Sequence, residues 1–441
     1  MDIRLSDHFN YSKLLRYSLP SIIMLVFTSV YGVVDGYFVS NYAGIPEFKA
    51  VNFIMPFLML LGSAGFMFGT GGGAIISKTI GEGKTKKANK LFSLIVYTSV
   101  ICGVLLAVLG LILLHPIAEI LGAKGRLLED CVTYGRIILL ALPAFILQYE
   151  FQCLFATAEK PKLGLYVTIA AGVTNIVLDA LFVAVFSWGL KGAAAATALS
   201  QCVGGIVPII YFAFPRGCLL QLGKTKLDIK ALSKTCVNGS SELMSNISMS
   251  IVSMMYNLQL MKYLGDDGVA AYGVLMYVSL VFQAVFIGYS VGTAPIIGYN
   301  YGANNRNELR GLLKKSLSII VVFAVLMFSA AFLMSKTVSY IFVGDDENLM
   351  TLTVRAFSIF SFSFLFSGFA IFGSSFFTAL NDGLTSAAIS FLRTLVFQVA
   401  AVLILPLLWK ADGIWLSVVL AEVMAVMVTA MFLKINRKKY L

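Results

Sequence analysis

The sequence predicts an all-α protein that crosses a membrane many times. Of its 441 residues, 59% are hydrophobic and only 12% are charged, and the mean hydropathy is +0.88. Soluble domains are usually about 45–50% apolar and about 25% charged. The apolar residues also form long blocks, for example residues 91–114 and 318–334. A run of about 18 such residues is long enough for a helix to cross the hydrocarbon layer of a membrane.

Twelve membrane-spanning helices are expected along the chain. Turn and charge signals separate them, as in GEGKTKK at residues 81–87 and NNRNELR at residues 304–310. The N-terminal segment mixes charges of both signs and runs into the first span without the features of a cleavable signal peptide. The expected spans are residues 17–40, 50–78, 91–114, 132–156, 163–187, 191–214, 238–262, 270–299, 315–335, 352–379, 384–408 and 412–434.

Lysine and arginine residues predict the orientation of these spans. Most of the 33 basic residues fall in the N-terminal segment, in the loops that follow the even-numbered spans, and at the C-terminus. Cytoplasmic loops retain positive charge, so both termini are expected in the cytoplasm. Anionic lipids of the inner leaflet account for the net charge of +11, and no nucleic-acid partner is needed to explain it.

The second half of the chain repeats the first at an offset of 221 residues. Gly81 falls on Gly302 and Tyr42 on Tyr263, and the offset stays constant through six spans. We therefore expect two six-helix bundles, an N-lobe (residues 1–214) and a C-lobe (residues 235–441), joined by a cytoplasmic linker (residues 215–234). Because each half has an even number of spans, a pseudo-two-fold axis along the membrane normal should relate the lobes, as in many transporters.

Several kinds of chemistry have little support in the sequence. The six cysteines show no paired spacing, and the two histidines are too few for a histidine-based metal site or catalytic triad. The glycine-rich stretch before Gly83 and Lys84 has Lys78 where a phosphate-binding loop needs glycine. We therefore expect neither enzyme activity nor a cofactor.

Acidic residues within the expected spans are candidates for function, because a carboxylate at mid-membrane costs about 2.5–3.5 kcal/mol. There are five, namely Asp35, Glu150, Asp179, Glu242 and Glu422. Glu150 and Glu422 have no evident partner. Glu242 opens the seventh span after NGSS, where capping of a helix N-terminus is an alternative explanation.

Asp35 and Asp179 differ from the others because polar residues accompany them. Asn175 and Asp179 are four residues apart and share one helix face. Asp179 and Thr197 flank a tight turn and each lies roughly 13 Å below the outer surface, while Asp35 lies roughly 10 Å deep. Tyr31 is one turn from Asp35. These five residues are expected to form one layer in the outer half of the N-lobe.

The repeat places this layer in one lobe only. At the offset of 221 residues, Asp35 corresponds to Tyr256, and the other three polar positions correspond to apolar residues. A purely architectural need would recur in both halves. Two carboxyl groups with amide and hydroxyl oxygens suit a proton, because burial and repulsion favour the neutral form, or a hard cation such as Na⁺. Both ions remain open at this stage.

These motifs resemble those of the multidrug and toxic compound extrusion (MATE) transporters, over essentially the whole chain. The resemblance lies in Pro20, in D-G-x-F-V-S from Asp35, in the stretch GTGGGAIIS at residues 69–77, in N-x-x-x-D at residues 175–179, and in the G-A-A-x-A-T stretch that ends at Thr197. It implies a twelve-helix exporter of amphipathic, often cationic compounds, driven by inward H⁺ or Na⁺.

The resemblance also implies roles for individual residues. Asp35, Asn175, Asp179 and Thr197 match the cation site of the N-lobe in relatives, and Pro20 matches a proline associated with bending of helix one. Some relatives place an acid in helix ten, but residues 356–380 contain none. Glu242 matches an acidic position at the start of helix seven.

A substrate cleft is expected between the lobes, because flexible methionines suit poorly specified apolar ligands. Its candidate lining residues are Gln201, Glu242, Met249, Met255, Tyr256, Met276 and Tyr277. The likeness is to bacterial exporters, so we expect a monomer in the cytoplasmic membrane with lipids and small molecules as its partners.

The alternative is a flippase or exporter of a lipid-linked or oligosaccharide substrate from the same superfamily. Fourteen spans and an arginine-lined cleft would favour it, and the sequence indicates neither. A major-facilitator carrier is disfavoured because KTIGEGKTKKANK, between the second and third spans, lacks that family's loop motif.

Overall fold

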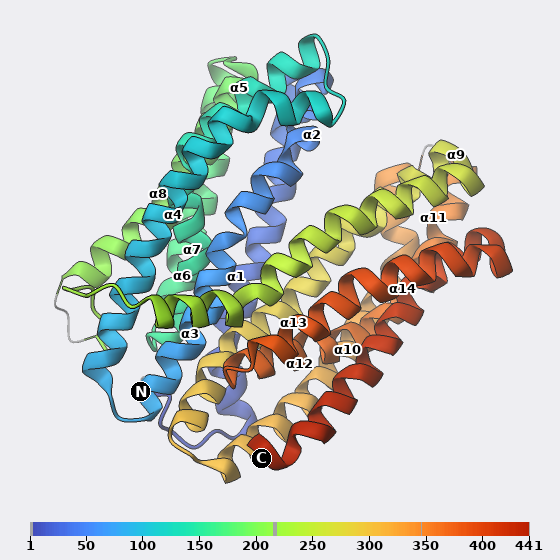
Figure 1. The fold of residues 1–441 in the computed structure, drawn as a ribbon. Coiled ribbons are helices and arrows are strands. Elements are labelled where there is room, and N and C mark those ends of the chain that lie inside the picture. Colours follow the sequence, from blue (N-terminus) through green and yellow to red (C-terminus); the bar gives the residue numbers. More distant parts are fainter. Residues whose placement is uncertain (1–2, 215–217, 345, 441) are drawn as a thin grey trace.

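The computed structural model describes residues 3–214, 218–344 and 346–440, and in this part of the chain the regular structure is entirely helical. Figure 1 shows the helices arranged as two arms that meet at one end and spread apart at the other. Both termini lie at the end where the arms meet. The chain therefore folds as a V.

The first arm contains α1 to α8. Two of its helices, α1 and α7, end in short π-helical segments, η1 and η2. The bounds are α1 (Tyr11–Phe38), η1 (Val39–Ala43), α2 (Ile45–Gly62), α3 (Ala64–Gly81), α4 (Thr85–Ile120), α5 (Arg126–Leu140), α6 (Leu142–Thr157), α7 (Pro161–Asp179), η2 (Ala180–Val185) and α8 (Gly189–Ala213).

The second arm contains α9 to α14. Its bounds are α9 (Ile229–Gly302), α10 (Arg306–Val343), α11 (Glu347–Phe360), η3 (Ser361–Ser363), α12 (Phe364–Ala379), α13 (Gly383–Phe391), η4 (Leu392–Val396) and α14 (Phe397–Tyr440). The long helix α9 is broken at Gly265, which has φ +65°. The helix α14 is broken at Trp409 and Lys410. Both breaks fall between spans that the sequence predicts as separate.

Some expected spans are less regular than the hydropathy indicates. The fourth, at residues 132–156, is bent by 60° between α5 and α6. Pro143 occupies the first turn of α6 and has no backbone N–H, so the hydrogen-bond ladder of α5 cannot continue through it. The second span is divided at Ser63, and the tenth by the 3₁₀ segment η3.

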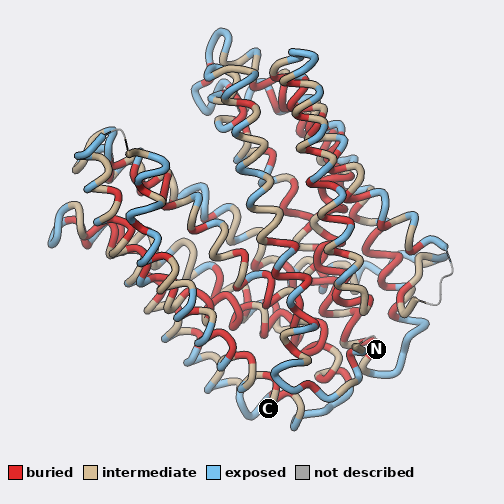
Figure 2. The backbone as a smooth tube through the Cα atoms, turned by 180° about the vertical axis from the view of Figure 1, so that it is seen from behind, coloured by how far each residue is buried: buried red, intermediate tan, exposed pale blue. Residues whose placement is uncertain are grey.

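The apolar surface of the helices suits a membrane. Nine helices of the described residues are long and apolar enough to cross one, or ten when the bent pair α5–α6 counts as a span. Large apolar side chains such as Ile112 and Leu333 point outward, at 67% and 78% exposure. Figure 2 shows the buried residues inside each arm and where the arms meet.

The arms meet through close contacts between helix backbones. A Cβ atom on Gly81 of α3 would lie 2.0 Å from the carbonyl oxygen of Tyr299 in α9. A Cβ atom on Gly302 of α9 would likewise lie 2.0 Å from the carbonyl oxygen of Lys78 in α3. Both glycines are therefore required for this approach. The two contacts correspond under the repeat, because 221 residues separate each residue from its counterpart.

Candidate functional site

Three helices of the first arm bring together the polar residues that the sequence singles out. Asp35 lies on α1, Asn175 and Asp179 on α7, and Thr197 on α8. The Thr197 hydroxyl donates a hydrogen bond of 3.4 Å to Oδ1 of Asp35. The Asp35 carboxyl group also interacts with the side chains of Asn175 and Asp179. The structure thus places all four residues in one cluster, which we call the acid cluster.

The helices around the acid cluster depart from regular α geometry. Asp179 is the last residue of α7, directly before the π segment η2, and Asp35 lies four residues before the π segment η1. The segments η1 and η2 contact each other. A π segment inserts an extra residue per turn and is frequent at functional sites. Here it redirects both helices beside the two carboxyl groups.

The members of the acid cluster differ in access to solvent. Asn175 is 1% exposed and Asp179 is fully buried, whereas Asp35 and Thr197 are half-buried. Both carboxyl oxygens of Asp179 and Oδ1 of Asn175 are buried without a hydrogen-bond partner. Unsatisfied buried oxygens are unfavourable, and a proton or a small cation would satisfy them.

Tyr31 lies one turn from Asp35, as expected, and its environment is polar. It lies in the electrostatic field of Asp35 and interacts with the Gln148 side chain of α6. Its ring lies 5.9 Å from that of Phe27. Gln201 of α8 is 7% exposed, and its Oε1 atom has no partner. A polar layer therefore continues from the acid cluster into the arm.

The structure adds Tyr134 of α5 to this group. Its side chain is 1% exposed, its hydroxyl is buried without a hydrogen-bond partner, and it lies near Thr197 in the electrostatic field of both Asp35 and Asp179. Tyr134 follows the start of α5 at Arg126 by about two turns, or ~12 Å. In the expected span 132–156 Tyr134 is only two residues from the outer end, so the depth argument could not group it with Asp35 and Asp179.

The remaining acids of the spans have different surroundings. Glu422 of α14 is not solitary, because Arg393 of η4 binds both of its carboxyl oxygens at 2.8–3.1 Å. Glu150 of α6 is fully buried, and neither of its oxygens has a partner. The capping explanation for Glu242 is wrong, because α9 begins at Ile229 and Glu242 lies well inside it. Glu242 is half-buried and lies in the field of Arg393.

The cleft candidates of the second arm differ in exposure. Met249 and Tyr277 are 57% and 42% exposed, and Met255 and Met276 are half-buried. Tyr256 is only 1% exposed, and its hydroxyl bonds to Gln398 and Ser417 at 2.8 and 2.7 Å. Tyr256 is therefore a core residue of the second arm in this structure and does not line a cleft.

Pro20 lies within α1, which continues through it without interruption. The residues beside it contact α9 closely. A Cβ atom on Gly292 would lie 2.8 Å from Cα of Ser18, and one on Gly288 would lie 2.6 Å from Cα of Ile22. The bend at Pro20 stays a prediction.

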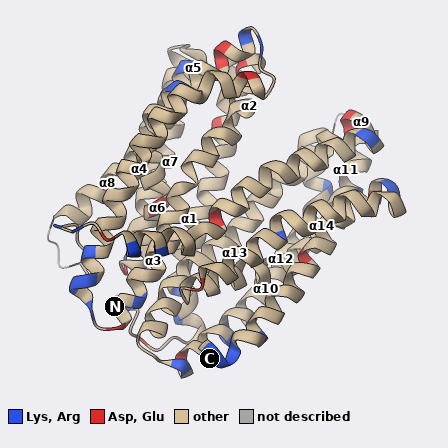
Figure 3. Ribbon diagram, in the orientation of Figure 1, with Lys and Arg blue, Asp and Glu red and all other residues tan. Residues whose placement is uncertain are grey.

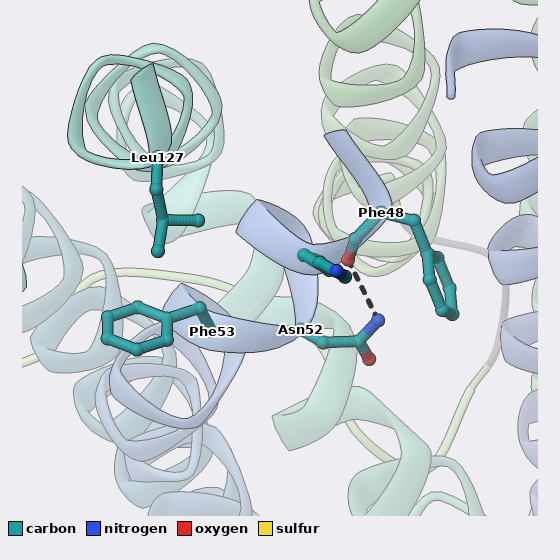
Figure 4. A pocket seen from close by; sticks show the side chains of 5 residues that line it. Phe48, Asn52, Phe53 and Leu127 are labelled. Atoms are coloured by element: carbon teal, nitrogen blue, oxygen red, sulfur yellow. Dashed lines mark hydrogen bonds between the residues drawn. The ribbon is translucent and has the colours of Figure 1, made fainter. Parts of the chain in front are cut away.

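A cavity lies beside α2 and the start of α5. It has a volume of about 460 Å³ and is lined mostly by apolar side chains. Figure 4 shows Phe53 and Leu127 facing it, and the Asn52 side chain donating to the Phe48 carbonyl at 2.9 Å. In the described ranges, no group of three or more His, Cys, Asp or Glu residues could hold a metal ion.

The fold and the buried acid cluster define a polytopic helical membrane protein of two arms. The chain belongs to the MatE family, whose model matches residues 20–181 and 243–404. The same model thus matches each half once, in agreement with the internal repeat.

Curated relatives extend over almost the whole chain. The multidrug export protein MepA of Staphylococcus haemolyticus is 25% identical over 414 residues, which cover 93% of this chain and 90% of the relative. MepA of Staphylococcus aureus strain NCTC 8325 is 24% identical over 416 residues, covering 93% and 91%.

Solved structures have the same fold. A MATE protein in complex with MaL6 matches with a TM-score of 0.93 at 21% identity, over 98% of each chain. An outward-facing multidrug resistance MATE transporter of the MOP superfamily matches with a TM-score of 0.92 at 21% identity, over 98% of this chain and 97% of that one.

Proposed function

We propose that the protein is a secondary active multidrug exporter, which expels amphipathic or cationic compounds in exchange for H⁺ or Na⁺. The acid cluster carries this proposal. It holds two carboxyl groups in contact, one of them fully buried, with three oxygens that lack a partner. The energy of such a site changes strongly when one positive charge binds. The names of the MepA relatives as multidrug export proteins support the choice of substrate class.

The proposed architecture is twelve spans in two six-helix bundles. The N-lobe (residues 1–214) corresponds to the first arm, the C-lobe (residues 235–441) to the second, and residues 215–234 link them. The breaks in α9 and α14 support this number of spans, because each divides one long helix into two. The matched glycine contacts of α3 and α9 support a pseudo-two-fold axis along the membrane normal.

The proposed orientation places both termini in the cytoplasm of a bacterium, with the protein as a monomer in the cytoplasmic membrane. Figure 3 supports it, because lysine and arginine residues gather at the end where both termini lie. In this orientation the V opens outward (Figure 1). The structure then represents the state in which the cytoplasmic side is closed.

The proposed cycle couples the acid cluster to the closure of the V. A proton or Na⁺ reaches Asp35 from the outside and is shared with Asp179, while Asn175 and Thr197 supply neutral oxygens. Neutralising the carboxyl groups removes their repulsion, so α1 and α7 can pack more closely there. The Pro20 turn of α1 allows the helix to bend, and the substrate is released before the outer cleft closes.

Substrates would bind between the arms. Glu242 supplies a negative charge for cationic compounds, and Gln201, which is 7% exposed in this structure, would supply a polar group only in a state that exposes it. Met249, Met255, Met276 and Tyr277 supply adaptable apolar contacts. A lipid-linked substrate without positive charge would gain no electrostatic attraction from Glu242.

The test is ethidium efflux from proteoliposomes that contain the wild type, Asp35→Asn or Asp179→Asn. Both variants should lose export under an imposed ion gradient, while their folding, measured by thermal unfolding, is retained. Asp266→Asn is the matched control, because Asp266 is exposed beside the break in α9. Export at the wild-type rate by both cluster variants would refute the assignment.

The same assay identifies the coupling ion. Wild-type efflux is measured with a pH gradient alone and with a sodium gradient alone. Export driven by only one gradient assigns that ion, and export driven by neither refutes antiport with H⁺ or Na⁺.

A further inference from the structure

A second cavity lies at the end of the molecule where the arms meet. Its volume is about 440 Å³, and three separated parts of the chain line it. The end of α3 and the start of α4 contribute residues 75–91, the start of α9 contributes residues 228–238, and the turn before α13 contributes Asn381 and Gly383. The cavity therefore has walls from both arms.

Its charged residues leave an excess of positive charge. Four lysines line it, namely Lys78, Lys87, Lys230 and Lys234. None of the four forms an ion pair with the residues that the structure describes, although Lys78 lies 5.0 Å above the ring of Tyr301.

The two carboxylates of the cavity are already engaged. Glu82 pairs with Lys84, which is not a lining residue, at 2.8 Å. Asp228 caps α9 by accepting a hydrogen bond of 3.0 Å from the backbone N–H of Ala231. The lining therefore holds four positive and two negative charges, and one of the two carboxylates also pairs with a lysine outside the lining.

The field in the cavity acts on Glu82, which lies at the end of α3 outside the spans. The hydrogen bond from Lys84 holds the pKa of Glu82 below its usual value, and the charges of Lys78 and Lys87 add to this effect. Two of the lining lysines thus create a positive potential at the cavity. A ligand with negative charge would be attracted there.

Exposed apolar side chains adjoin the lysines. Leu227 and Ile229, on either side of Asp228, are 72% and 71% exposed. Large apolar residues beside lysines are typical of segments that lie at a membrane surface. The cavity is therefore accessible to lipid headgroups as well as to solutes of the adjacent compartment.

The cavity exists only while the arms meet. The Asn381 side chain of the second arm donates to the carbonyl of Ala74 in α3 at 3.3 Å. A Cβ atom on Gly71 of α3 would lie 2.1 Å from the carbonyl oxygen of Thr235 in α9, next to the lining residue Lys234. Separation of the arms at this end would pull Lys78 and Lys87 away from Asn381 and Gly383.

We propose that this cavity binds an anionic phosphate group, and that the bound phosphate stabilises the state in which the arms meet at this end. The carrier is either the headgroup of an anionic lipid or a soluble phosphate compound. A ligand that binds one of two conformations shifts the equilibrium toward it by its difference in affinity. Only the description of this end as cytoplasmic rests on the proposed function.

The first test measures thermal unfolding of the purified full chain while ligand is added. Short-chain phosphatidylglycerol tests the lipid source and ATP tests the soluble source. Short-chain phosphatidylcholine is the control, because it carries the same phosphate without net charge. A rise in melting temperature with either anion, but not with phosphatidylcholine, supports the proposal and identifies the source. No rise with either anion refutes it.

Two double variants test whether the anion binds in this cavity. Lys230→Gln with Lys234→Gln removes two lining charges, and Lys86→Gln with Lys224→Gln removes two charges of the same face that do not line the cavity. Each lysine near an anionic surface is worth about 1 kcal/mol, so the first variant should bind roughly thirtyfold more weakly. Equal affinity of the two variants would refute the assignment.

The conformational part is tested with spin labels on the spread ends of the two arms, outside the cavity. The effective anion should increase the population with the long distance in the control variant and leave the lining variant unchanged. An unchanged distribution in both variants would refute the effect on conformation. These measurements require no export, so failure of the proposed function leaves their outcome intact.

Discussion

At the scale of single residues, the site depends on unequal burial of two carboxyl groups. Asp179 is fully buried at the end of α7, while Asp35 on α1 keeps access to solvent. A positive charge bound beside Asp35 would therefore change the energy of a carboxyl group that solvent cannot reach. Tyr134 and Thr197 lie beside this pair. We call these two residues the polar wall.

Tyr134→Phe tests this wall. The hydroxyl is buried without a hydrogen-bond partner in the field of the two carboxyl groups, and a polar interaction of this kind is worth about 0.5–1.5 kcal/mol. We expect the apparent affinity for the coupling ion to fall by roughly two- to tenfold, with the maximal export rate nearly retained. Initial rates of efflux against ion concentration measure both quantities. Tyr166→Phe, on an exposed side chain of α7, is the control. A reduced maximal rate with unchanged ion affinity would contradict the assigned role.

The pair of Arg393 and Glu422 allows a second prediction. The two side chains are 13% and 5% exposed. Removing one partner of a buried pair leaves the other charge uncompensated and costs about 3–5 kcal/mol. Arg393→Met and Glu422→Leu should each lower the melting temperature strongly, and the double variant should recover most of the loss. Thermal unfolding in detergent measures all three. Additive losses in the double variant would show that the pair contributes nothing as a pair.

At the scale of elements, the N-terminal segment joins the two arms. The Leu5 N–H donates to Glu159, between α6 and α7, at 2.6 Å. The Phe9 N–H donates to Glu308, at the start of α10, at 3.0 Å. Leu5 and Phe9 are fully buried. Lys315 of α10 also donates to the Phe9 carbonyl. The segment is therefore a strap across the joint of the arms.

Weakening this strap should shift the conformational equilibrium. Glu159→Gln with Glu308→Gln replaces two charged acceptors by neutral ones, and hydrogen bonds to charged groups are roughly twice as strong. We expect the joint to open more often, so that cysteines placed on its inner faces react faster with a thiol reagent. Glu347→Gln, in the first turn of α11, is the control. Labelling at the rate of the control variant would show that the strap does not stabilise the closed joint.

At the scale of the molecule, the V divides the protein into a closed end and an open end. Helices α3 and α9 cross at the closed end with carbonyl groups against glycines. Such a contact has no side chains to adapt, so it is either fully made or absent. The arms are thus suited to move as rigid bodies between two states.

A disulfide across the closed end tests this motion. A Cβ atom on Gly298 of α9 would lie 3.2 Å from Cβ of Ser77 in α3, close to the roughly 3.5–4.5 Å of a disulfide. In a background without the six native cysteines, Ser77→Cys with Gly298→Cys should block export when oxidised. Reduction should restore it. Each single cysteine variant is the control, and full export by the oxidised double variant would contradict a cycle that opens this end.

The sequence predicts most of the helices correctly because hydropathy alone determines which segments can leave water. The breaks near Gly265 and Lys410 coincide with polar signals between apolar runs. The bend at Ala141 was missed because hydropathy does not register a proline in an apolar run. The burial of Tyr256 was missed for a similar reason, since periodicity cannot tell a helix face in the core from one that lines a cleft.

The sequence by itself determined the helical membrane class, the repeat and the four polar residues of the acid cluster, because unfavourable charges in apolar helices are rare and conspicuous. Only the tertiary structure decided that Arg393 neutralises Glu422, that Tyr134 joins the acid cluster, and that the N-terminal strap and a lysine-lined cavity span the joint of the arms. These features depend on which faces meet between distant helices. That choice is made by packing, and packing involves residues that are far apart in the chain.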